Sequence, residues 1–361
     1  MKVLLLSRYG GRGASSRVRM YQFLPGLRQE GIDVTVAPLI DDALLAARYA
    51  RGGYPGASLL AAYVRRIGRL FEVRRYDLVW IEYELFPWLP GVAERLFAAA
   101  GVPYVAEYDD AVFHRYDLHP RRVVRGALGG KIDGVMRGAA TVIAGNAYLA
   151  GHARAAGARH VVEIPSVVDT DVYQPGPPPI GRPARVGWIG SPTTAPYLHA
   201  VAAPLARLAD AGCIQVTLVG VEPGAEAWAF PCVERRWNAA DEVADVQGFD
   251  IGIMPLPDEP WERGKCGYKL VQYMACGRPV VASPVGANRD IVHDGVEGRL
   301  ATTPDEWDRA LSALAEDVAG RVRMGAAGRA RAEQGYSRQS ALPRLAGALK
   351  AAAGVPTAAG E

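Results

Sequence analysis

The chain has 361 residues, of which 50% are hydrophobic and 22% charged, with a formal net charge of +3. Two domains are expected at this length, and the small, scattered charge argues against nucleic-acid binding. No segment approaches the ~18 uncharged apolar residues of a membrane span, and no secretory signal precedes the first predicted strand. The four cysteines form no C-x-x-C pair. We therefore expect a cytoplasmic protein with reduced thiols.

Strand-like runs alternate with helical segments through the first half of the chain. These runs are "KVLLLS", "IDVTVAPL", "YDLVWIEYE", "VPYVAEYDD" and "AATVIAGN". The helical segment "RVRMYQFLPGLRQEG" is predicted to end at Gly31, in the left-handed conformation that glycine accepts. Such alternation is typical of a parallel sheet covered by helices on both faces.

The composition changes at "QPGPPPIGRP", where closely spaced prolines exclude a helix or an inner strand. The runs "ARVGWIGS", "IQVTLVG", "FDIGIMPL" and "RPVVASPVG" then predict a second parallel sheet. The predicted organisation is α/β: a Rossmann-like domain over 1–173, a hinge over 174–183, a second Rossmann-like domain over 184–335, and a helix with a frayed tail over 336–361. Ligands of such folds bind at the carboxyl ends of the strands, so we expect a ligand in a cleft between the domains.

The stretch "GKCGYKLVQYMACG" combines a glycine-punctuated turn with a helix and holds two of the five lysines. A helix N-terminus stabilises an anion such as a diphosphate through free N–H groups and its dipole. Lys265 and Lys269 add compact charges on nearly the same face. Gln272 lies one turn further and can bond a ribose. The alternative is an ordinary strand–loop–helix unit with solvated lysines.

A second polar loop, "GWIGSPTTAPYL", follows the first strand of the second domain. It delivers Gly190, Ser191, Thr193 and Thr194 to a helix start. The hydroxyls can cap that helix or meet a phosphate. After a later strand, Arg236 with its neighbours Trp237 and Asn238 can bond or stack on a base.

Polar residues also end the strands of the first domain. The loop "YGGRGASSRVR" does not match G-x-G-x-x-G, which disfavours a dinucleotide site. Asp109 and Asp110 are expected at a strand end, holding acceptor hydroxyls with His114 as a partner. One aspartate pair without a further ligand is thin support for a metal, so no metal is predicted. Glu82 and Glu84 either line the same pocket or begin a helix.

The segment "LLAAYVRRIGRLFEVRRY" is an amphipathic, arginine-bearing helix. It can lie on an anionic membrane or receive a lipid-linked acceptor. The alternative is an ordinary helix with a solvated arginine face, and we favour it on the sequence.

The segment "GKCGYKLVQYMACGRPVVASPVGANRDIVHDGVEG" resembles the donor-binding region of the retaining GT-B glycosyltransferases, group 1 or family four. Weaker matches are "ASSRVRMYQFLPGLRQEGIDVTV", "IPSVVDTDVYQP" and "GWIGSPTT". The family usually has two glutamates eight apart, on the donor sugar and the ribose. Gly264 and Gln272 stand there instead, so Glu262 or Asp258 is a candidate substitute, with a solvated loop acid as the alternative.

The resemblance implies transfer of a sugar from a nucleotide diphosphate to an acceptor hydroxyl with retention. We expect no metal or other cofactor, because a helix N-terminus with two lysines can stabilise the leaving diphosphate. The first domain would bind the acceptor and the second the donor. Expected partners are a nucleotide sugar and a glycan, lipid-linked or small-molecule acceptor, with contact at the inner membrane face as a further option. The rival functions are a degenerate nucleotide-sugar-binding protein, a sugar phosphorylase or epimerase, and an NAD-dependent oxidoreductase. The predicted site residues are Lys265, Lys269, Asp110 and His114 for catalysis; Gly190, Ser191, Thr193, Thr194, Arg236, Gly264, Cys266, Gly267, Tyr268, Gln272, Gly11 and Gly13 for the donor; and Ser16, Arg17, Glu82 and Asp109 for the acceptor.

Overall fold

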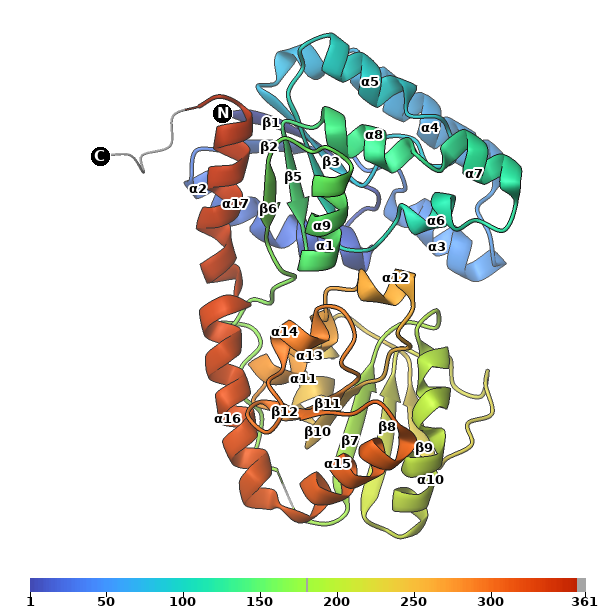
Figure 1. Ribbon diagram of the computed structural model, residues 1–361, viewed down its shortest axis with the longest axis vertical. Coiled ribbons are helices and arrows are strands. Elements are labelled where there is room, and N and C mark those ends of the chain that lie inside the picture. The colour runs from blue at the N-terminus through green and yellow to red at the C-terminus, as the bar shows by residue number, and fades with distance from the viewer. Residues whose placement is uncertain (180, 356–361) are drawn as a thin grey trace. The chain divides into compact units, whose positions relative to one another are not determined.

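The computed structural model describes residues 1–179 and 181–355 (Figure 1). Ile180 of the predicted hinge and residues 356–361 of the predicted tail lie outside the described residues. The chain divides into two units. Unit 1 comprises Met1–Ser166, Gly264–Cys266 and the chain from Ala341 on; unit 2 comprises Val167–Arg263 and Gly267–Ser340. The division falls a few residues before the predicted hinge, and a three-residue segment of the donor motif belongs to unit 1.

The sheet of unit 1 has six parallel strands in the order β2-β1-β3-β4-β5-β6. Its inner strands are continuous apolar runs because helices cover both faces. The short sixth strand has no strong pattern and was not predicted. The strands are β1 (Lys2–Leu6), β2 (Asp33–Val36), β3 (Leu78–Glu82), β4 (Tyr104–Tyr108), β5 (Thr141–Ala144) and β6 (Val161–Glu163).

The helices of unit 1 connect these strands and flank the sheet in Figure 1. Gly31 has the predicted left-handed conformation, with a φ of 76°. The helix predicted before it is broken into two short helices by a 3-10 turn over Tyr21–Phe23. The helices are α1 (Ala14–Arg19), α2 (Leu24–Gln29), α3 (Asp42–Arg51), α4 (Gly56–Leu70), α5 (Val92–Ala99), α6 (His114–Asp117), α7 (Arg122–Leu128), α8 (Lys131–Gly138) and α9 (Ala147–Ala155).

Unit 2 holds a second six-stranded parallel sheet in the order β12-β11-β10-β7-β8-β9. Its strands are β7 (Ala184–Ile189), β8 (Ile214–Val219), β9 (Cys232–Arg235), β10 (Ile251–Met254), β11 (Val280–Ala282) and β12 (Gly298–Leu300). Its helices are α10 (Ala202–Asp210), α11 (Glu242–Gln247), α12 (Pro260–Arg263), α13 (Tyr268–Ala275), α14 (Asn288–Ile291), α15 (Pro304–Glu316) and α16 (Val318–Gly335), with a 3-10 helix over Ala195–Val201. The last helix, α17 (Arg338–Ala352), lies where a C-terminal helix was predicted. Two Rossmann-like α/β units confirm the predicted fold class.

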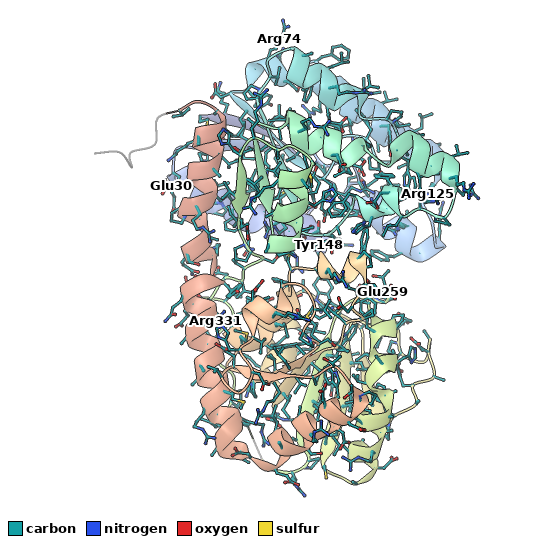
Figure 2. All side chains as sticks on the ribbon, in the orientation of Figure 1. Glu30, Arg74, Arg125, Tyr148, Glu259 and Arg331 are labelled. Atoms are coloured by element: carbon teal, nitrogen blue, oxygen red, sulfur yellow. The ribbon has the colours of Figure 1, made fainter. Side chains whose placement is uncertain are left out.

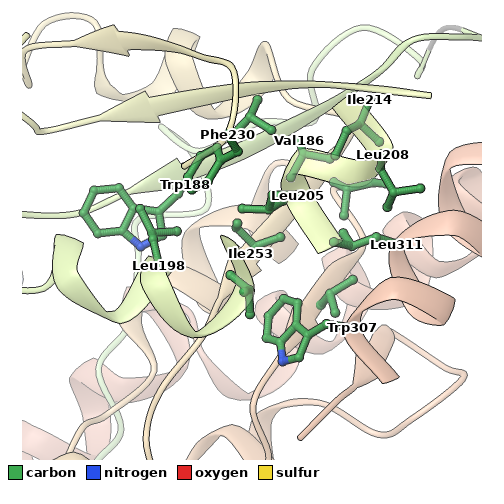
Figure 3. Close-up of a cluster of buried hydrophobic side chains, with 14 of the residues drawn as sticks. Val186, Trp188, Leu198, Leu205, Leu208, Ile214, Phe230, Ile253, Trp307 and Leu311 are labelled. Carbon is green, nitrogen blue, oxygen red and sulfur yellow. The ribbon is translucent and has the colours of Figure 1, made fainter. Parts of the chain in front are cut away.

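One core of unit 2 packs between its sheet and the helices on one face (Figure 3). Trp188 and Val186 of β7 are buried in it together with Leu205 of α10. Trp307 of α15 closes the cluster and is 1% exposed. Helix α15 begins there because Thr303 and Glu306 form a capping box, which pairs otherwise orphaned N–H groups.

Replacing Trp307 with alanine is expected to destabilise unit 2 by about 3–5 kcal/mol, because it removes buried apolar area and leaves a cavity. The Tm should fall by several degrees in a thermal unfolding experiment. Val322→Ala on α16 is the control, since Val322 is 49% exposed. Equal Tm values for the two variants would contradict the packing described.

Candidate active site

The order of strands in unit 2 identifies where a ligand is expected. β7 pairs with β8 on one side and with β10 on the other, so the connections from β7 and β10 leave in opposite directions. Such a switch point opens a crevice at the carboxyl ends of the strands. The loop after β7 and the segment between β10 and α13 both begin at this edge. They carry the two predicted donor-binding motifs.

The loop after β7 gathers three hydroxyl groups. Ser191 Oγ lies 2.9 Å from Thr193 Oγ1, and Thr194 Oγ1 donates to the Ser191 carbonyl at 3.1 Å. Gly190 precedes them, with its N–H donating to the Val219 carbonyl at 2.9 Å. The hydroxyls therefore bond within the turn and form a polar cluster at the sheet edge, whereas no side chain caps the 3-10 helix that follows, so the capping alternative is not observed.

Lys269 brings a full positive charge to this cluster. Its Nζ donates to Thr194 Oγ1 at 3.4 Å and lies 5.2 Å from the centre of the Trp188 ring. A Cβ at Gly190 would stand 2.8 Å from Lys269 Cε, so a larger residue there would obstruct the lysine. The ammonium, the hydroxyls and the start of α13 together form a site suited to an anion.

Lys265 does not lie on the helix as predicted. Helix α13 begins only at Tyr268, so Lys265 precedes the helix and does not share a face with Lys269. The separation arises at Gly267, whose φ of 64° is left-handed. Lys265 Nζ lies 3.5 Å from Asp110 Oδ1 within unit 1. The prediction that the two lysines share one helix face is therefore wrong.

The segment Gly264–Cys266 is fastened to unit 1 through its backbone. Asn146 Nδ2 donates to the carbonyls of Gly264 at 2.9 Å and Lys265 at 3.1 Å. The Cys266 thiol donates to the Asp109 carbonyl at 3.1 Å, and burial raises the pKa of this thiol far above its ordinary value. Cys266 is therefore a neutral packing residue in this structure, and its predicted contact with the donor stays a prediction, as does that of Gly264.

Gln272 is buried and bonded within unit 2. Its Nε2 donates to Tyr173 Oη at 3.0 Å and to Glu242 Oε1 at 3.1 Å. Glu242 in turn accepts from the indole Nε1 of Trp237 at 2.5 Å. A carboxylate thus reaches the neighbourhood where the family has its second glutamate, but it comes from α11. Sequence reasoning missed Glu242 because it lies 30 residues before Gln272, outside any motif.

Of the two acids proposed to replace the first family glutamate, only Glu262 is buried. It accepts from the Tyr197 hydroxyl, and Tyr197 lies in the 3-10 helix that follows Thr194. Asp258 pairs with Arg263 at 2.7 Å on the surface. The solvated-acid alternative therefore describes Asp258, whereas Glu262 is held near the polar loop of β7.

Arg236 is exposed after β9. Its Nε lies 3.0 Å from both carboxylate oxygens of Glu222, and this ion pair raises the pKa of the guanidinium. The neighbouring Trp237 is 37% exposed and is fixed by Glu242. The flat indole is thus the better oriented of the two side chains for stacking on a base.

The Gly-rich loop of unit 1 is held by a buried carboxylate. Glu82 at the end of β3 accepts from the hydroxyls of Ser15 and Ser16 and from the Arg8 N–H at 2.6 Å. Glu82 is 2% exposed and Ser16 is fully buried, so neither side chain is accessible to an acceptor in this structure. Both side chains therefore position the loop in this structure.

The remaining loop residues predicted to bind ligand are differently placed. Gly11 is exposed, whereas Gly13 is buried and a Cβ there would lie 2.1 Å from Tyr9 Cβ. Arg17 is half-buried on α1. The predicted ligand contacts of all three stay predictions.

Asp109 and Asp110 follow β4 as predicted, but His114 is not their partner. Asp109 accepts from the Tyr83 hydroxyl, and Asp110 pairs with Lys265. Nδ1 of His114 lies 2.9 Å from Asp117 Oδ1 and its Nε2 lies 2.8 Å from Tyr148 Oη. The histidine bonds across α6 and α9 instead because both ring nitrogens find closer partners there.

Glu84 neither begins a helix nor faces solvent. Its carboxylate is buried against Lys131 Nζ and accepts from the Tyr116 hydroxyl at 2.8 Å. Tyr83, between Glu82 and Glu84, has a φ of 62°, which a non-glycine residue rarely adopts. This backbone conformation ends β3 and separates the environments of the two glutamates.

Within residues 1–179 and 181–355, no group of three or more His, Cys, Asp and Glu side chains is arranged to hold a metal ion. Over the same residues, no helix has the length and apolarity needed to cross a bilayer.

Two families of known proteins match the chain. Residues 16–172 match Glycosyltransferase Family 4, and residues 186–317 match Glycosyl transferases group 1. These stretches together cover most of both units. The chain belongs to the group 1, family 4 glycosyltransferases. Its GT-B fold, with two Rossmann-like units, is the fold that the resemblance implied.

The individual proteins that match most of this glycosyltransferase have low sequence identity to it. It is 28% identical over 320 residues to a D-inositol 3-phosphate glycosyltransferase of Arthrobacter sp., covering 78% of this chain and 73% of the relative. Among solved structures it resembles Anabaena HepE in complex with UDP and glucose, with 19% identity, a TM-score of 0.70 and coverage of 97% and 100% of the two chains. A sucrose-phosphate synthase from Thermosynechococcus elongatus gives 14% identity, a TM-score of 0.66 and coverage of 96% and 97%. At these identities the structural likeness shows the fold alone.

Gly267→Ala tests the turn that separates the two lysines of the glycosyltransferase. The added Cβ would lie 2.2 Å from Ile291 Cδ1 at a φ of 64°. We expect a loss of about 2–4 kcal/mol from backbone strain and overpacking, seen as a lower Tm. Gly347→Ala is the matched control, because no atom lies within 4 Å of its added Cβ in α17. That variant should be neutral or more stable by about 1 kcal/mol. Similar losses in both variants would contradict a special requirement at Gly267.

The pH dependence of stability tests the environment of Asp110. Burial raises the pKa of this carboxyl to about 6, although Lys265 opposes the rise. Since the unfolded value is about 3.9, the folded state binds the proton more tightly, and this contribution to stability is lost as the pH rises from about 4 through 6. Relative to Asp110→Asn, the wild type should therefore lose about 1–2 kcal/mol of its free energy of unfolding over that range. The loss is limited because Asp110 is only half-buried. Thermal unfolding of both proteins at pH 4.5 and 7.5 measures this difference in stability. Parallel Tm changes in the two proteins would contradict the raised pKa.

Proposed function

We propose that this glycosyltransferase moves a hexosyl group from a UDP-sugar to an acceptor hydroxyl, with retention of anomeric configuration and without a metal ion. The observation that carries the proposal is the convergence of Lys269 with the hydroxyls of the β7 loop at the switch point of unit 2. This location is where α/β folds bind nucleotides, and its charge suits a diphosphate. The structural neighbours support UDP as the nucleotide, because HepE was solved in complex with UDP, with UDP-glucose and with UDP and glucose.

The leaving diphosphate needs positive potential as charge develops on it. Lys269 provides an ammonium that is held against Thr194 and Trp188. The N-terminus of α13 adds the partial charge of a helix end. Preorganised charges of this kind stabilise a transition state without the cost of reorienting solvent. In this proposal they act where other sugar transferases use a divalent ion.

The sugar and ribose hydroxyls need acceptors, and the two usual glutamates are replaced. Glu262, held by Tyr197, is proposed to serve the donor sugar. The network of Gln272, Glu242 and Tyr173 is proposed to serve the ribose side and to hold Trp237 against the base. Hydrogen bonds to these donors hold each carboxyl group in a fixed place.

The acceptor side is proposed to lie at the carboxyl ends of β3 and β4 in unit 1. Asp109 and Asp110 stand at that edge, and Lys265 holds the second of them. Retention without a protein nucleophile follows the family resemblance, with a donor oxygen receiving the acceptor proton. Transfer by the purified protein, with the product's anomeric configuration read by NMR, tests this part. An inverted product, or donor turnover that depends on phosphate, would overturn it.

Lys269→Ala is expected to weaken UDP binding by about 10- to 100-fold, because charge-assisted hydrogen bonds are worth roughly 1.5–3 kcal/mol. A thermal-shift series with UDP, GDP, ADP and dTDP measures it, since a ligand that binds the folded state raises the Tm. UDP should give the largest shift in the wild type, and Lys269→Ala should remove most of it.

Lys265→Ala and Lys350→Ala complete this series. Lys265 pairs with Asp110 in unit 1, so its loss should lower the UDP shift less than loss of Lys269. Lys350 lies in α17, paired with Glu30 at 3.1 Å, and its loss should leave the shift unchanged. An unchanged UDP shift in Lys269→Ala would remove the diphosphate assignment.

A further inference from the structure

Helix α4 exposes an apolar stripe to solvent. Leu60, Val64, Ile67 and Phe71 follow one another at intervals of four, three and four residues, so they lie on one face of the helix. Their exposed fractions range from 47% for Ile67 to 85% for Phe71. Soluble proteins ordinarily bury such a face, and a contiguous exposed one marks an interaction site. Arg65 and Arg69 of the same helix are exposed, as the solvated-arginine interpretation expected, and the apolar stripe is exposed as well.

The opposite side of α4 fixes this orientation. Arg66 is buried at 3% exposure and donates from Nη2 to the carbonyls of Ser7 and Ala37, the latter at 3.1 Å. Tyr63 donates to the Pro87 carbonyl at 2.8 Å, and its ring centre lies 5.8 Å from that of Phe86. One of the three arginines of the helix thus points inward, where it satisfies two carbonyls, and the apolar stripe lies outside.

The segment against which Tyr63 packs continues the exposed apolar surface. Trp88 and Leu89 follow it directly and are 50% and 47% exposed. Val92 and Leu96, one turn apart on α5, are also exposed. We call the eight residues from α4 and this segment the docking face: Leu60, Val64, Ile67, Phe71, Trp88, Leu89, Val92 and Leu96. An indole and a phenyl ring among aliphatic side chains suit the boundary between lipid headgroups and acyl chains.

The charge around the docking face is positive. Residues 41–77 contain seven arginines, one of them the buried Arg66, and four acidic residues. Arg51, Arg74 and Arg75 are exposed, and Figure 2 shows Arg74 projecting from the surface of unit 1. Arg65 and Arg69 are exposed as well, paired with Asp41 and Glu72. An apolar stripe with a cationic border matches an anionic lipid surface.

The same charge disfavours a second copy of the chain as the occupant. In a two-fold symmetric dimer each docking face would meet its own kind, so the arginine borders would be brought together. Like charges across an interface oppose association. Anionic lipid headgroups instead place negative charge around the apolar stripe.

We propose that unit 1 docks on anionic membrane surfaces through the docking face, with α4 lying parallel to the bilayer. The four side chains of α4 enter the interface, and the arginines stay at the level of the lipid phosphates. This surface attachment is separate from the sugar-transfer chemistry and does not depend on the identity of the donor.

Sedimentation of the full chain with sucrose-loaded vesicles tests the proposal. Vesicles of phosphatidylglycerol and phosphatidylcholine should bind the protein at least about tenfold more strongly than phosphatidylcholine alone, and salt should weaken the binding. The double variant Ile67→Glu, Phe71→Glu should reduce partitioning onto the anionic vesicles by about tenfold or more. Arg74→Gln with Arg75→Gln should reduce both the partitioning and its dependence on salt.

The matched control is Val172→Glu with Val322→Glu, which places the same charges at exposed valines of unit 2. It should bind vesicles like the wild type, and all variants should keep the wild-type Tm because the altered side chains are exposed. Absence of binding to anionic vesicles would overturn the proposal, as would equal losses in the control. A wild-type dimer without lipid that Ile67→Glu, Phe71→Glu makes monomeric would assign the face to a second copy instead.

Discussion

The left-handed turn at Gly267 is the constraint on which the arrangement of the donor motif depends. A φ of 64° at this position is open to glycine at little cost, and a side chain would collide with Ile291. The preceding loop ends at this turn, and α13 begins at the next residue, Tyr268. Lys265 is therefore delivered to Asp110 and Lys269 to Thr194, each in its own unit. One short motif serves two chemically different environments because its central residue has no side chain.

Buried carboxylates perform most of the positioning around both sites. Glu82 holds the Gly-rich loop through hydroxyl and backbone donors, and Glu242 holds Trp237 and Gln272. Glu107 on β4 joins Arg19 at 2.8 Å, and burial raises the pKa of its carboxyl to about 7 against the opposing effect of this arginine. A buried charge is tolerated only when donors surround it, so each of these acids specifies the position of its neighbours.

These networks bear on the two positions at which the donor motif departs from the family pattern. The position of the second glutamate holds Gln272, whose amide donates to Glu242. The carboxylate of Glu242 thus lies beside the position of the usual second glutamate. Glu262 stands close in sequence to the lost first glutamate and is held by Tyr197. Substitution of a motif residue need not remove the chemical group when a neighbouring element can supply it.

The sequence was sufficient to predict those features of the fold that depend on local interactions. The inner strands, the two-unit α/β architecture, the left-handed Gly31 and the start of α13 follow from apolar runs and glycine conformations, which depend on residues close together in the chain. The short strands β6 and β12 were not foreseen because their three residues include polar side chains and are mostly half-buried, so they form no apolar run.

The partners of the polar side chains were decided only by tertiary structure. His114 bonds Tyr148 from α9 and Asp117 one turn along α6 instead of Asp109 or Asp110, and Gln272 meets Glu242 from another helix. The outward face of α4 likewise depends on Arg66 finding carbonyls inside unit 1, which no helical periodicity can reveal. The sequence by itself thus determined the elements and their order. Which charges meet, and which apolar face is left uncovered, depended on packing, because these contacts join residues far apart in the chain.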